Sequence, residues 1–347
     1  MTRPFITISK RKIGPGFTPF VIAEIGINHE GSFKKAIRMV DDAKKAGCEC
    51  VKFQSHVIDD EMIPEAKNVV PGHTKESIYE IMERCALSED EEIKLKKYVE
   101  DLGMIYLCSP FSRAAADRLQ KMKVPAFKIG SGECNNYPLI DHIASFGKPI
   151  ILSTGMNDIA SIKIAVKTIK KHGTPLALFH CTSLYPTPYE KVRLGGIAEL
   201  MKAFPGIPIG LSDHSIGNYT SFAAAALGAS LIEKHFTSSK KWPGPDIAIS
   251  IDPEELEDLI IGVDAIHKSL GGKKGVLKEE KPTIDFAYAC VVSIMNIKKG
   301  EKFSKENIWV KRPGTGEIKA VDFGKVLGKK ALKDIKKDIQ IKWGDFK

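Results

Sequence analysis

Short apolar stretches alternate with longer amphipathic stretches along the chain between residues 21 and 270. Each apolar stretch has the length of one buried strand, and each amphipathic stretch has the pattern of a helix. The predicted strands are 21–26, 48–53, 104–109, 126–131, 149–155, 176–181, 208–213 and 230–236. Eight strands that alternate with helices predict an α/β fold of the (β/α)8 TIM-barrel type rather than an open sheet.

Capping residues support two of the predicted helices. Ser32 precedes the stretch FKKAIRMVDDAKK and Gly47 follows it, so we expect one helix between them. Asp252 stands directly before Pro253 at the start of another amphipathic stretch. An N-cap carboxylate followed by proline is typical of the first turn of a helix.

The pattern changes at three places. Residues 54–87 form a long insertion after the second strand, with a loop expected over 62–73, and such insertions border the active end of a barrel. Residues 271–282, GGKKGVLKEEKP, have the composition of a linker. Short β-rich runs separated by glycine turns then follow. We therefore predict a TIM-barrel catalytic domain over 1–270, a linker over 271–282 and a small, mostly β domain over 283–347.

The last barrel strand, SLIEKHF at residues 230–236, contains charged side chains in an apolar context. Strand side chains alternate between faces, so Glu233 and His235 point to the same side as Leu231. Burial of such groups costs several kcal/mol, in order of magnitude, unless each has a partner. The end of this strand is therefore predicted to belong to a binding site.

The formal net charge of +9 comes from the last part of the chain. Residues 1–270 carry 33 basic and 33 acidic side chains, whereas residues 271–347 carry 19 and 10. The basic residues of this tail have few aromatic neighbours, which argues against a base-stacking surface for nucleic acid. Positive potential over an anionic small molecule is one interpretation, and a lysine-rich soluble surface is the other.

The apolar runs, the first residues and the cysteines predict a soluble, cytoplasmic protein. No apolar run reaches the ~20 residues that span a bilayer, and the first residues, MTRPFITISK, lack the apolar core of a signal peptide. The seven cysteines include no C-x-x-C pair, so buried reduced thiols are expected rather than disulfides or a zinc site. Inert packing is also the interpretation for Cys108 and Cys181, which have no obvious base nearby in the sequence.

Polar residues stand at the ends of nearly all the predicted strands, where a TIM barrel carries its catalytic groups. Ammonium and hydroxyl groups donate hydrogen bonds to anionic oxygens, so these lysines and serines suit a phosphate and a carboxylate. Lys128 has a structural alternative, an ion pair across the barrel. The donors concerned are Lys52, Lys128, Ser131, Ser153, Ser183 and Ser212.

Two histidines end neighbouring strands. A single histidine at a strand end is more often structural, but His214 and His235 together are candidates for binding one divalent ion. Glu24, Glu133 and Asp246 are then candidates for proton transfer. A metal that polarises a carbonyl beside a bound phosphate ester suggests carbon–carbon bond formation of an aldol type.

Ten motifs in order resemble one family. They are AEIGINHEGS, VKFQ, SPFS, FKIGSGECNNYPLI, LSTGM, HCTSLYPTP, GLSDHS, EKHFT, GPD and IWVKRPG. From about residue 18 to the end, the chain is similar to the sialic acid synthases, the family of the bacterial N-acetylneuraminate synthases. The resemblance implies a barrel followed by an antifreeze-like (SAF) domain. It implies the metal-dependent condensation of phosphoenolpyruvate with N-acetylmannosamine, giving N-acetylneuraminate and phosphate.

The resemblance also implies roles for individual residues. His214 and His235 would bind the metal, with Mn²⁺ expected and Mg²⁺ or Co²⁺ as alternatives, and Glu24 or Glu133 would activate water. The residues implied to bind phosphoenolpyruvate are Lys52, Ser109, Lys128, Ser131, Ser153, Ser183 and Ser212. Those implied to bind the sugar are Gln54, Glu133, Tyr185, Asp246 and Arg312. Many relatives carry asparagine in place of Ser183, whose hydroxyl has a shorter reach.

Arg312 lies in the tail, and the resemblance implies that it reaches the barrel of a second subunit in a domain-swapped homodimer. The nearest alternative function is a legionaminic or pseudaminic acid synthase that uses a di-acetamido sugar, and a 6-phosphorylated sugar is a further one. A non-catalytic carbohydrate- or ice-binding module is suggested only by the tail. Charged residues at the strand ends, including Glu24 and Lys52, argue against a catalytically dead barrel. Neither a nucleic acid nor a membrane is expected as a partner.

Overall fold

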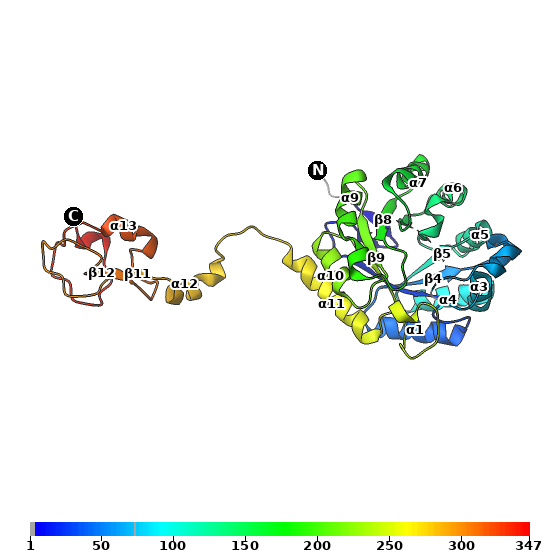
Figure 1. Ribbon diagram of the computed structural model, residues 1–347, viewed down its shortest axis with the longest axis horizontal. Helices are drawn as coiled ribbons and strands as arrows, with labels where there is room; N and C mark the ends of the chain where they lie inside the picture. Colours follow the sequence, from blue (N-terminus) through cyan, green and yellow to red (C-terminus); the bar gives the residue numbers. More distant parts are fainter. Residues whose placement is uncertain (1–3, 73) are drawn as a thin grey trace. The chain divides into compact units, whose positions relative to one another are not determined.

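The computed structural model describes residues 4–72 and 74–347. The chain forms two compact units, one that ends at Gly271 and one that begins at Gly272. Figure 1 shows the course of the chain through both units.

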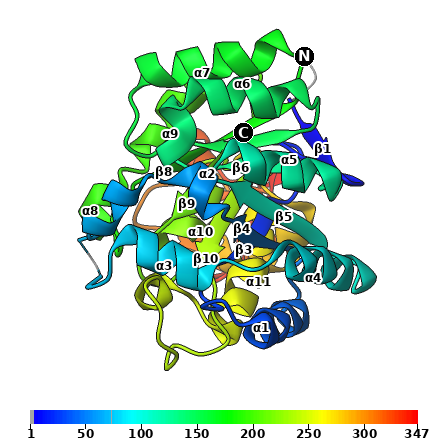
Figure 2. The same cartoon turned by 90° about the vertical axis from the view of Figure 1, so that its right-hand side faces the viewer.

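Eight parallel strands close into a barrel in the first unit. Each of them overlaps one of the eight predicted strands, so the predicted TIM barrel is confirmed. Figure 2 shows the helices packed around the strands. The strands are β3 (Phe20–Gly26), β4 (Cys50–Ser55), β5 (Ile105–Pro110), β6 (Phe127–Ile129), β7 (Ile150–Ser153), β8 (Leu176–Cys181), β9 (Ile209–Asp213) and β10 (Leu231–His235).

The helices between the strands begin where capping side chains are available. Ser32 and Asp252 are N-caps, as the sequence predicts: Ser32 accepts a hydrogen bond from the Lys35 amide at 3.3 Å, and Asp252 additionally forms a reciprocal capping box with Glu255. The outer helices are α1 (Phe33–Lys45), α4 (Glu89–Asp101), α5 (Arg113–Lys121), α6 (Tyr137–Ser145), α7 (Ile159–Lys171), α9 (Gly195–Ala203), α10 (Tyr219–Ala226) and α11 (Pro253–Ser269). Shorter turns are η2 (Gly132–Asn135), α8 (Tyr189–Val192) and η3 (Ile247–Ile249).

The alternation along β10 separates two buried layers. Leu231 packs inside the barrel with Phe20, whereas Ile232 and Phe236 pack in the layer between the strands and the helices. A hairpin of β1 (Ile6–Ile8) and β2 (Arg11–Ile13) adds isoleucines to the inner cluster. The hydrophobic pattern did not predict this hairpin, because a strand of three residues is too short to show a period. The hairpin covers the end of the barrel where the strands begin, which leaves the opposite end for a site.

The insertion after β4 contains α2 (Ile58–Glu61), η1 (Pro64–Asn68) and α3 (Ile78–Cys85). The predicted loop over 62–73 therefore includes a 3₁₀ turn, and its residue 73 lies outside the described residues. Ile81 and Cys85 of α3 are buried against Ile27, which follows β3. This contact fixes the insertion to the active end of the barrel.

The second unit has its own small core. Its elements are η4 (Lys278–Glu280), α12 (Lys281–Ala287), β11 (Cys290–Ser293), β12 (Ile308–Lys311), η5 (Ala320–Asp322), α13 (Phe323–Val326) and η6 (Trp343–Asp345). The strands β11 and β12 pair antiparallel and pack on a cluster that includes Val291, Phe303 and Ile341. The predicted linker over 271–282 becomes helical from Lys278, because Pro282 stands in the first turn of α12, where proline is tolerated.

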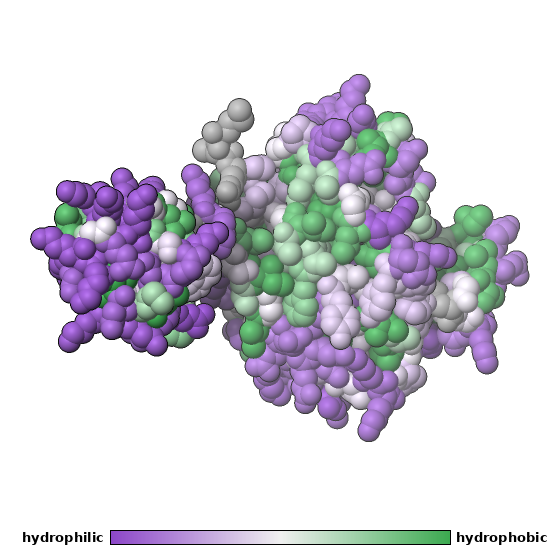
Figure 3. Space-filling view, turned by 60° about the vertical axis from the view of Figure 1, so that its left-hand side comes forward, coloured by the Kyte–Doolittle hydropathy of each residue, from purple (hydrophilic) through white to green (hydrophobic). Residues whose placement is uncertain are grey.

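The face of the second unit that Figure 3 shows is dominated by hydrophilic residues. This agrees with the excess of basic side chains in residues 271–347. In the described part of the chain, no helix combines the length and the apolar composition needed to cross a membrane.

Candidate active site

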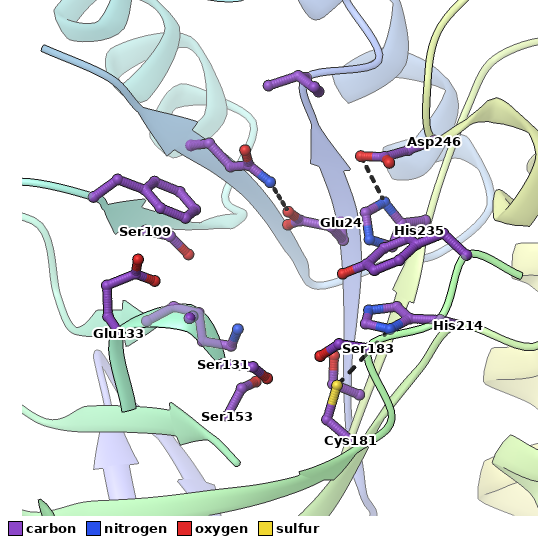
Figure 4. A pocket seen from close by; sticks show the side chains of 18 of the residues that line it. Glu24, Ser109, Ser131, Glu133, Ser153, Cys181, Ser183, His214, His235 and Asp246 are labelled. Carbon is purple, nitrogen blue, oxygen red and sulfur yellow. Dashed lines mark hydrogen bonds and ion pairs between the residues drawn. The ribbon is translucent and has the colours of Figure 1, made fainter. Parts of the chain in front are cut away.

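A pocket of about 520 Å³ lies at the C-terminal ends of the barrel strands. Every barrel residue predicted for the site lines it, and Figure 4 shows how several of them converge. They are Glu24, Lys52, Gln54, Ser109, Lys128, Ser131, Glu133, Ser153, Ser183, Tyr185, Ser212, His214, His235 and Asp246. Arg312, the remaining predicted residue, lies exposed in the second unit.

Two buried lysines in the pocket are each paired with a carboxylate. Lys52 Nζ lies 2.6 Å from Glu24 Oε2, and Lys128 Nζ lies 3.3 Å from Glu233 Oε1. Glu233 Oε1 also accepts a hydrogen bond from Ser212 Oγ at 3.0 Å and lies 3.9 Å from Lys52 Nζ. When Glu24 is ionised the four charges balance, so the lysines can be buried at fixed positions before any ligand arrives.

Burial and ion pairing compete at the two carboxylates, and their pKa values move in opposite directions. Burial raises the pKa of Glu24 to about 7, although the charge of Lys52 opposes the shift. Burial also acts to raise the pKa of Glu233, but Lys128 and Lys52 outweigh it and lower that pKa below its usual value. Two adjacent carboxylates with pKa values moved apart are typical of a site where one transfers protons and the other stays charged.

His214 and His235 lie side by side, with ring centroids 5.4 Å apart. His214 Nδ1 donates to the Thr182 carbonyl at 2.9 Å. Burial acts to lower the pKa of His214, but Cys181 and the Thr182 carbonyl outweigh it and raise that pKa. In its neutral form the ring offers the Nε2 lone pair to an ion. Burial holds the pKa of His235 well below its ordinary value, so this ring is neutral. Asp246 Oδ2 lies 3.6 Å from His235 Nδ1. Two adjacent imidazoles are ligands of the kind that a divalent ion such as Mn²⁺ takes, and the neighbouring carboxylate can orient one of them.

Within residues 4–72 and 74–347, no three His, Cys, Asp or Glu side chains form a group that could hold a metal ion on their own. The two histidines with Lys52 and Lys128 nevertheless line one pocket, although they come from β4, β6, β10 and the end of β9. The hypothesis of a metal ion beside a bound phosphate ester requires these four side chains to lie at one end of the barrel.

Hydroxyl groups gather on the opposite side of the pocket from Asp246 (Figure 4). Ser131 Oγ accepts a hydrogen bond from the Gly155 amide at 3.0 Å. A Cβ atom at Gly155 would lie 2.5 Å from Ser183 Oγ and 2.8 Å from Ser131 Oγ, so only glycine allows both hydroxyls to approach. Ser153 Oγ is buried without a hydrogen-bond partner from the described residues. An unsatisfied buried hydroxyl costs about 1–3 kcal/mol, which a ligand oxygen would recover.

Three features of the site were missed or only partly predicted. Glu233 was expected near the site, but its pairing with both lysines depends on strands distant in the sequence. Cys181 was interpreted as inert packing, yet it lines the pocket with its Sγ 3.8 Å from His214 Nδ1. Burial acts to raise its pKa, but His214 outweighs this effect and lowers it. Lys234 Nζ pairs with Asp213 Oδ2 at 3.1 Å, and both are fully buried.

Comparison with known proteins identifies matching domains and relatives. Residues 39–275 match the NeuB family and residues 288–347 match the SAF domain. An uncharacterized protein of Methanocaldococcus jannaschii is 41% identical over 98% of both chains. The N,N'-diacetyllegionaminic acid synthase of Campylobacter jejuni is 36% identical over 92% of this chain and 97% of its own. The crystal structure of the N-acetylneuraminic acid (sialic acid) synthetase of Leptospira borgpetersenii superposes with a TM-score of 0.74 at 32% identity, covering 81% of this chain and 95% of that one.

The closed barrel and its charged pocket, followed by a SAF domain, define an enzyme of the nonulosonic acid synthase class. The chain belongs to the NeuB family, which confirms the sialic acid synthase family predicted from the motifs. The predicted condensing enzyme, a transferase that forms carbon–carbon bonds, is confirmed at the level of this family.

Proposed function

We propose that the protein is an N-acetylneuraminate synthase, which condenses phosphoenolpyruvate with N-acetylmannosamine. The observation that carries this proposal is the pocket that two buried lysines and several serine hydroxyls share with a pair of adjacent histidines. Phosphoenolpyruvate has a phosphate and a carboxylate close together, and this donor set offers both of them charge-assisted hydrogen bonds. The support from relatives is a sialic acid synthetase that is 32% identical.

The lysines and serines bind and orient the phospho-enol in this proposal. Lys52 and Lys128 supply charge, while Ser109, Ser131, Ser153, Ser183 and Ser212 donate hydrogen bonds to phosphate and carboxylate oxygens. Glu24 and Glu233 are the partners of these lysines before phosphoenolpyruvate binds. The phosphate and carboxylate of phosphoenolpyruvate would therefore share the lysines with the two glutamates.

His214 and His235 would hold the divalent ion, with Asp246 beside them. When bound, such an ion acts as a Lewis acid on the aldehyde carbonyl of the sugar. Gln54, Glu133 and Tyr185 provide polar contacts for the sugar, and Ile78, Ile81 and Met82 of the insertion provide an apolar surface for its N-acetyl methyl group.

The bond changes balance without any further reactant except water. The C3 carbon of phosphoenolpyruvate forms a bond to the aldehyde carbon, which leaves an oxocarbenium centre at C2. Water adds to C2 and transfers a proton to Glu24, whose pKa of about 7 suits a general base. The oxygen of the former aldehyde takes up one proton, which Glu24 can return. The C2–O bond to phosphate then breaks while the remaining hydroxyl proton on C2 passes to the departing phosphate, which gives the ketone and inorganic phosphate.

The pH dependence of catalysis tests the assignment of Glu24. The base must be ionised, so kcat/KM of the wild type is expected to rise as the pH increases through about 7. Glu24→Gln is expected to lose this rise, while the matched variant Glu133→Gln keeps it and shows weaker sugar binding. Initial rates between pH 5.5 and 9 measure the effect. Titration of the substrates is the same for every variant, so it does not affect the comparison between their pH profiles. A rise that persists in Glu24→Gln and disappears in Glu133→Gln would assign the base to Glu133.

The choice of sugar is the finer part of the proposal. The competing substrates are the di-acetamido sugars of legionaminic and pseudaminic acid synthesis, and a legionaminic relative is 36% identical. A panel of N-acetylmannosamine, its 6-phosphate and the di-acetamido sugars, with release of phosphate from phosphoenolpyruvate as the assay, separates them. The highest kcat/KM is expected for N-acetylmannosamine with added Mn²⁺, and Mg²⁺, Co²⁺ and chelator are the comparisons. A higher value for a di-acetamido sugar would replace the proposed function with the sibling activity.

We also propose that the site is completed in a domain-swapped homodimer, in which Arg312 of one subunit serves the barrel of the other. The net charge of the second unit supports this, since positive potential attracts anionic substrates. Exposed apolar side chains follow β7, β8 and β9 at the active end of the barrel, where a second subunit would cover them. They are Met156, Leu184, Tyr189, Ile216 and Tyr219.

Mixing two impaired variants, assayed at a phosphoenolpyruvate concentration near the wild-type KM, tests the exchange. Lys128→Met removes a barrel lysine and Arg312→Ala removes the tail arginine. In a swapped dimer, one of the two sites in each mixed dimer has both residues, so random mixing is expected to restore about a quarter of wild-type activity. The experiment refolds the two variants together, measures the fraction of mixed dimers, and then measures activity. If each subunit used its own Arg312, the activity of the mixture would not exceed the average of the two separate variants.

A further inference from the structure

His56 directly follows β4. It is the middle residue of a line of hydrogen-bonded side chains, from Glu61 through Gln54 to Glu24, that ends in the pocket. Its Nδ1 lies 2.8 Å from Glu61 Oε2, and its Nε2 lies 3.1 Å from Gln54 Oε1. Gln54 Nε2 donates to Glu24 Oε1 at 3.2 Å. The line therefore connects α2 of the insertion with the carboxylate assigned above as the general base.

The polarity of these hydrogen bonds fixes the protonation of the ring. An ionised carboxylate only accepts, so the Gln54 amide must turn its NH₂ group toward Glu24 and its oxygen toward His56. Glu61 is also an acceptor. His56 therefore faces an acceptor at each ring nitrogen and must donate from both, which only the imidazolium form can do.

The surroundings hold this cation in place. The His56 side chain is 1% exposed, and its ring stacks on Phe111 with centroids 4.7 Å apart and planes inclined by 16°. Stacking fixes the ring plane, and Glu61 supplies the compensating charge that a buried cation requires. The pKa of the nearby His29 is lowered to about 4, mainly by burial and secondly by the charge of His56. The His29 ring therefore stays neutral and does not repel the His56 cation.

We propose that His56 is a positioning residue whose imidazolium, anchored by Glu61, holds the Gln54 amide in the one orientation that donates to Glu24. The proposal rests on the function proposed above for this site. If His56 lost its Nε2 hydrogen, the amide could rotate and present its oxygen to Glu24, where two acceptors repel. Glu24 would then lose a directional contact and Gln54 would present the wrong group to the sugar.

Kinetics of His56→Phe test this role, since phenylalanine keeps a ring on Phe111 and removes both donors. We expect kcat/KM for the sugar to fall about 10- to 100-fold, the loss typical of one charge-assisted hydrogen bond, with KM for phosphoenolpyruvate changed less than twofold. Glu61→Gln, which keeps an acceptor but removes the charge, is expected to fall between this variant and wild type. His142→Phe is the matched control, because His142 also contacts a carboxylate and a phenylalanine but lies on α6 outside the pocket lining.

The protonation of His56 is measured independently of activity by ¹⁵N NMR of protein labelled at histidine nitrogens, with the signals assigned by their loss in His56→Phe. Both ring nitrogens are expected to carry hydrogen at pH 7.5 in the wild type. A single N–H on His56, or an unchanged kcat/KM for the sugar in a folded His56→Phe, overturns the proposal. A wild type that turns over none of the sugars would instead refute the proposed function, because the NMR result does not depend on turnover.

Discussion

Replacement of His235 by alanine is expected to lower kcat by about a thousandfold or more, because the variant loses one of the two imidazoles proposed to hold the catalytic ion. Lewis-acid stabilisation of a developing charge contributes several kcal/mol, and each ~1.4 kcal/mol is tenfold in rate. His235 is neutral and buried next to His214, so its loss removes a donor that no neighbouring imidazole replaces at that position. Phosphate release from phosphoenolpyruvate measures the effect, after chelator treatment and again with Mn²⁺ added.

The control for this variant is His142→Ala, which removes a half-exposed histidine paired with Asp117 on the outside of the barrel. It is expected to keep wild-type turnover. Thermal unfolding of both variants checks that the barrel persists, and metal analysis after dialysis checks that His235→Ala retains less than one ion per subunit. Full activity of a chelator-treated His235→Ala protein would contradict the metal assignment.

Lys128→Met is expected to raise KM for phosphoenolpyruvate by about 100-fold or more, the effect of truncating one partner of a buried charged contact. The side chain is 5% exposed, so no solvent compensates for its loss. The variant is also expected to be less stable by about 3 kcal/mol, because Glu233 remains buried with its nearest cation, Lys52, 3.9 Å away. Steady-state kinetics and denaturant unfolding measure the two effects.

A double variant separates binding from stability. Lys128→Met combined with Glu233→Gln removes the unpaired charge, so stability should recover while the high KM remains. If the double variant recovered both properties, Lys128 would be a structural partner of Glu233 and not a substrate ligand. That outcome is the structural alternative that the sequence left open for Lys128.

The spacing of the two histidines depends on a pair outside the pocket. Asp213 and Lys234 lie opposite each other in the β9–β10 register, one residue before His214 and one before His235 respectively. Asp213 Oδ2 also accepts from Thr220 Oγ1 at 2.6 Å and from Ser221 Oγ at 2.8 Å, both on α10. Lys234 Nζ additionally donates to the Ser215 carbonyl. These fully satisfied contacts lock the two strand ends together, and with them the two imidazoles.

The sequence by itself determined the order of the eight barrel strands and the end of the barrel at which their polar residues lie. These depend on local rules: a period of two along each strand, caps at the helix starts, and the need of a buried polar group for a partner. They were enough to place Lys52, Lys128, His214 and His235 on one end of a barrel. The family-specific motifs then identified the class of enzyme.

Only the tertiary structure decided which of these groups meet. Closure of the barrel brings β10 beside β3, which sets His235 opposite Glu24 although 211 positions separate them. The pairing of Glu233 with two lysines, the approach of Ser183 to Gly155 and the line from Glu61 to Glu24 likewise join segments that no short pattern connects. The physical reason is that hydrogen bonds and ion pairs act over a few ångströms in space, whereas local sequence rules act over a few residues along the chain.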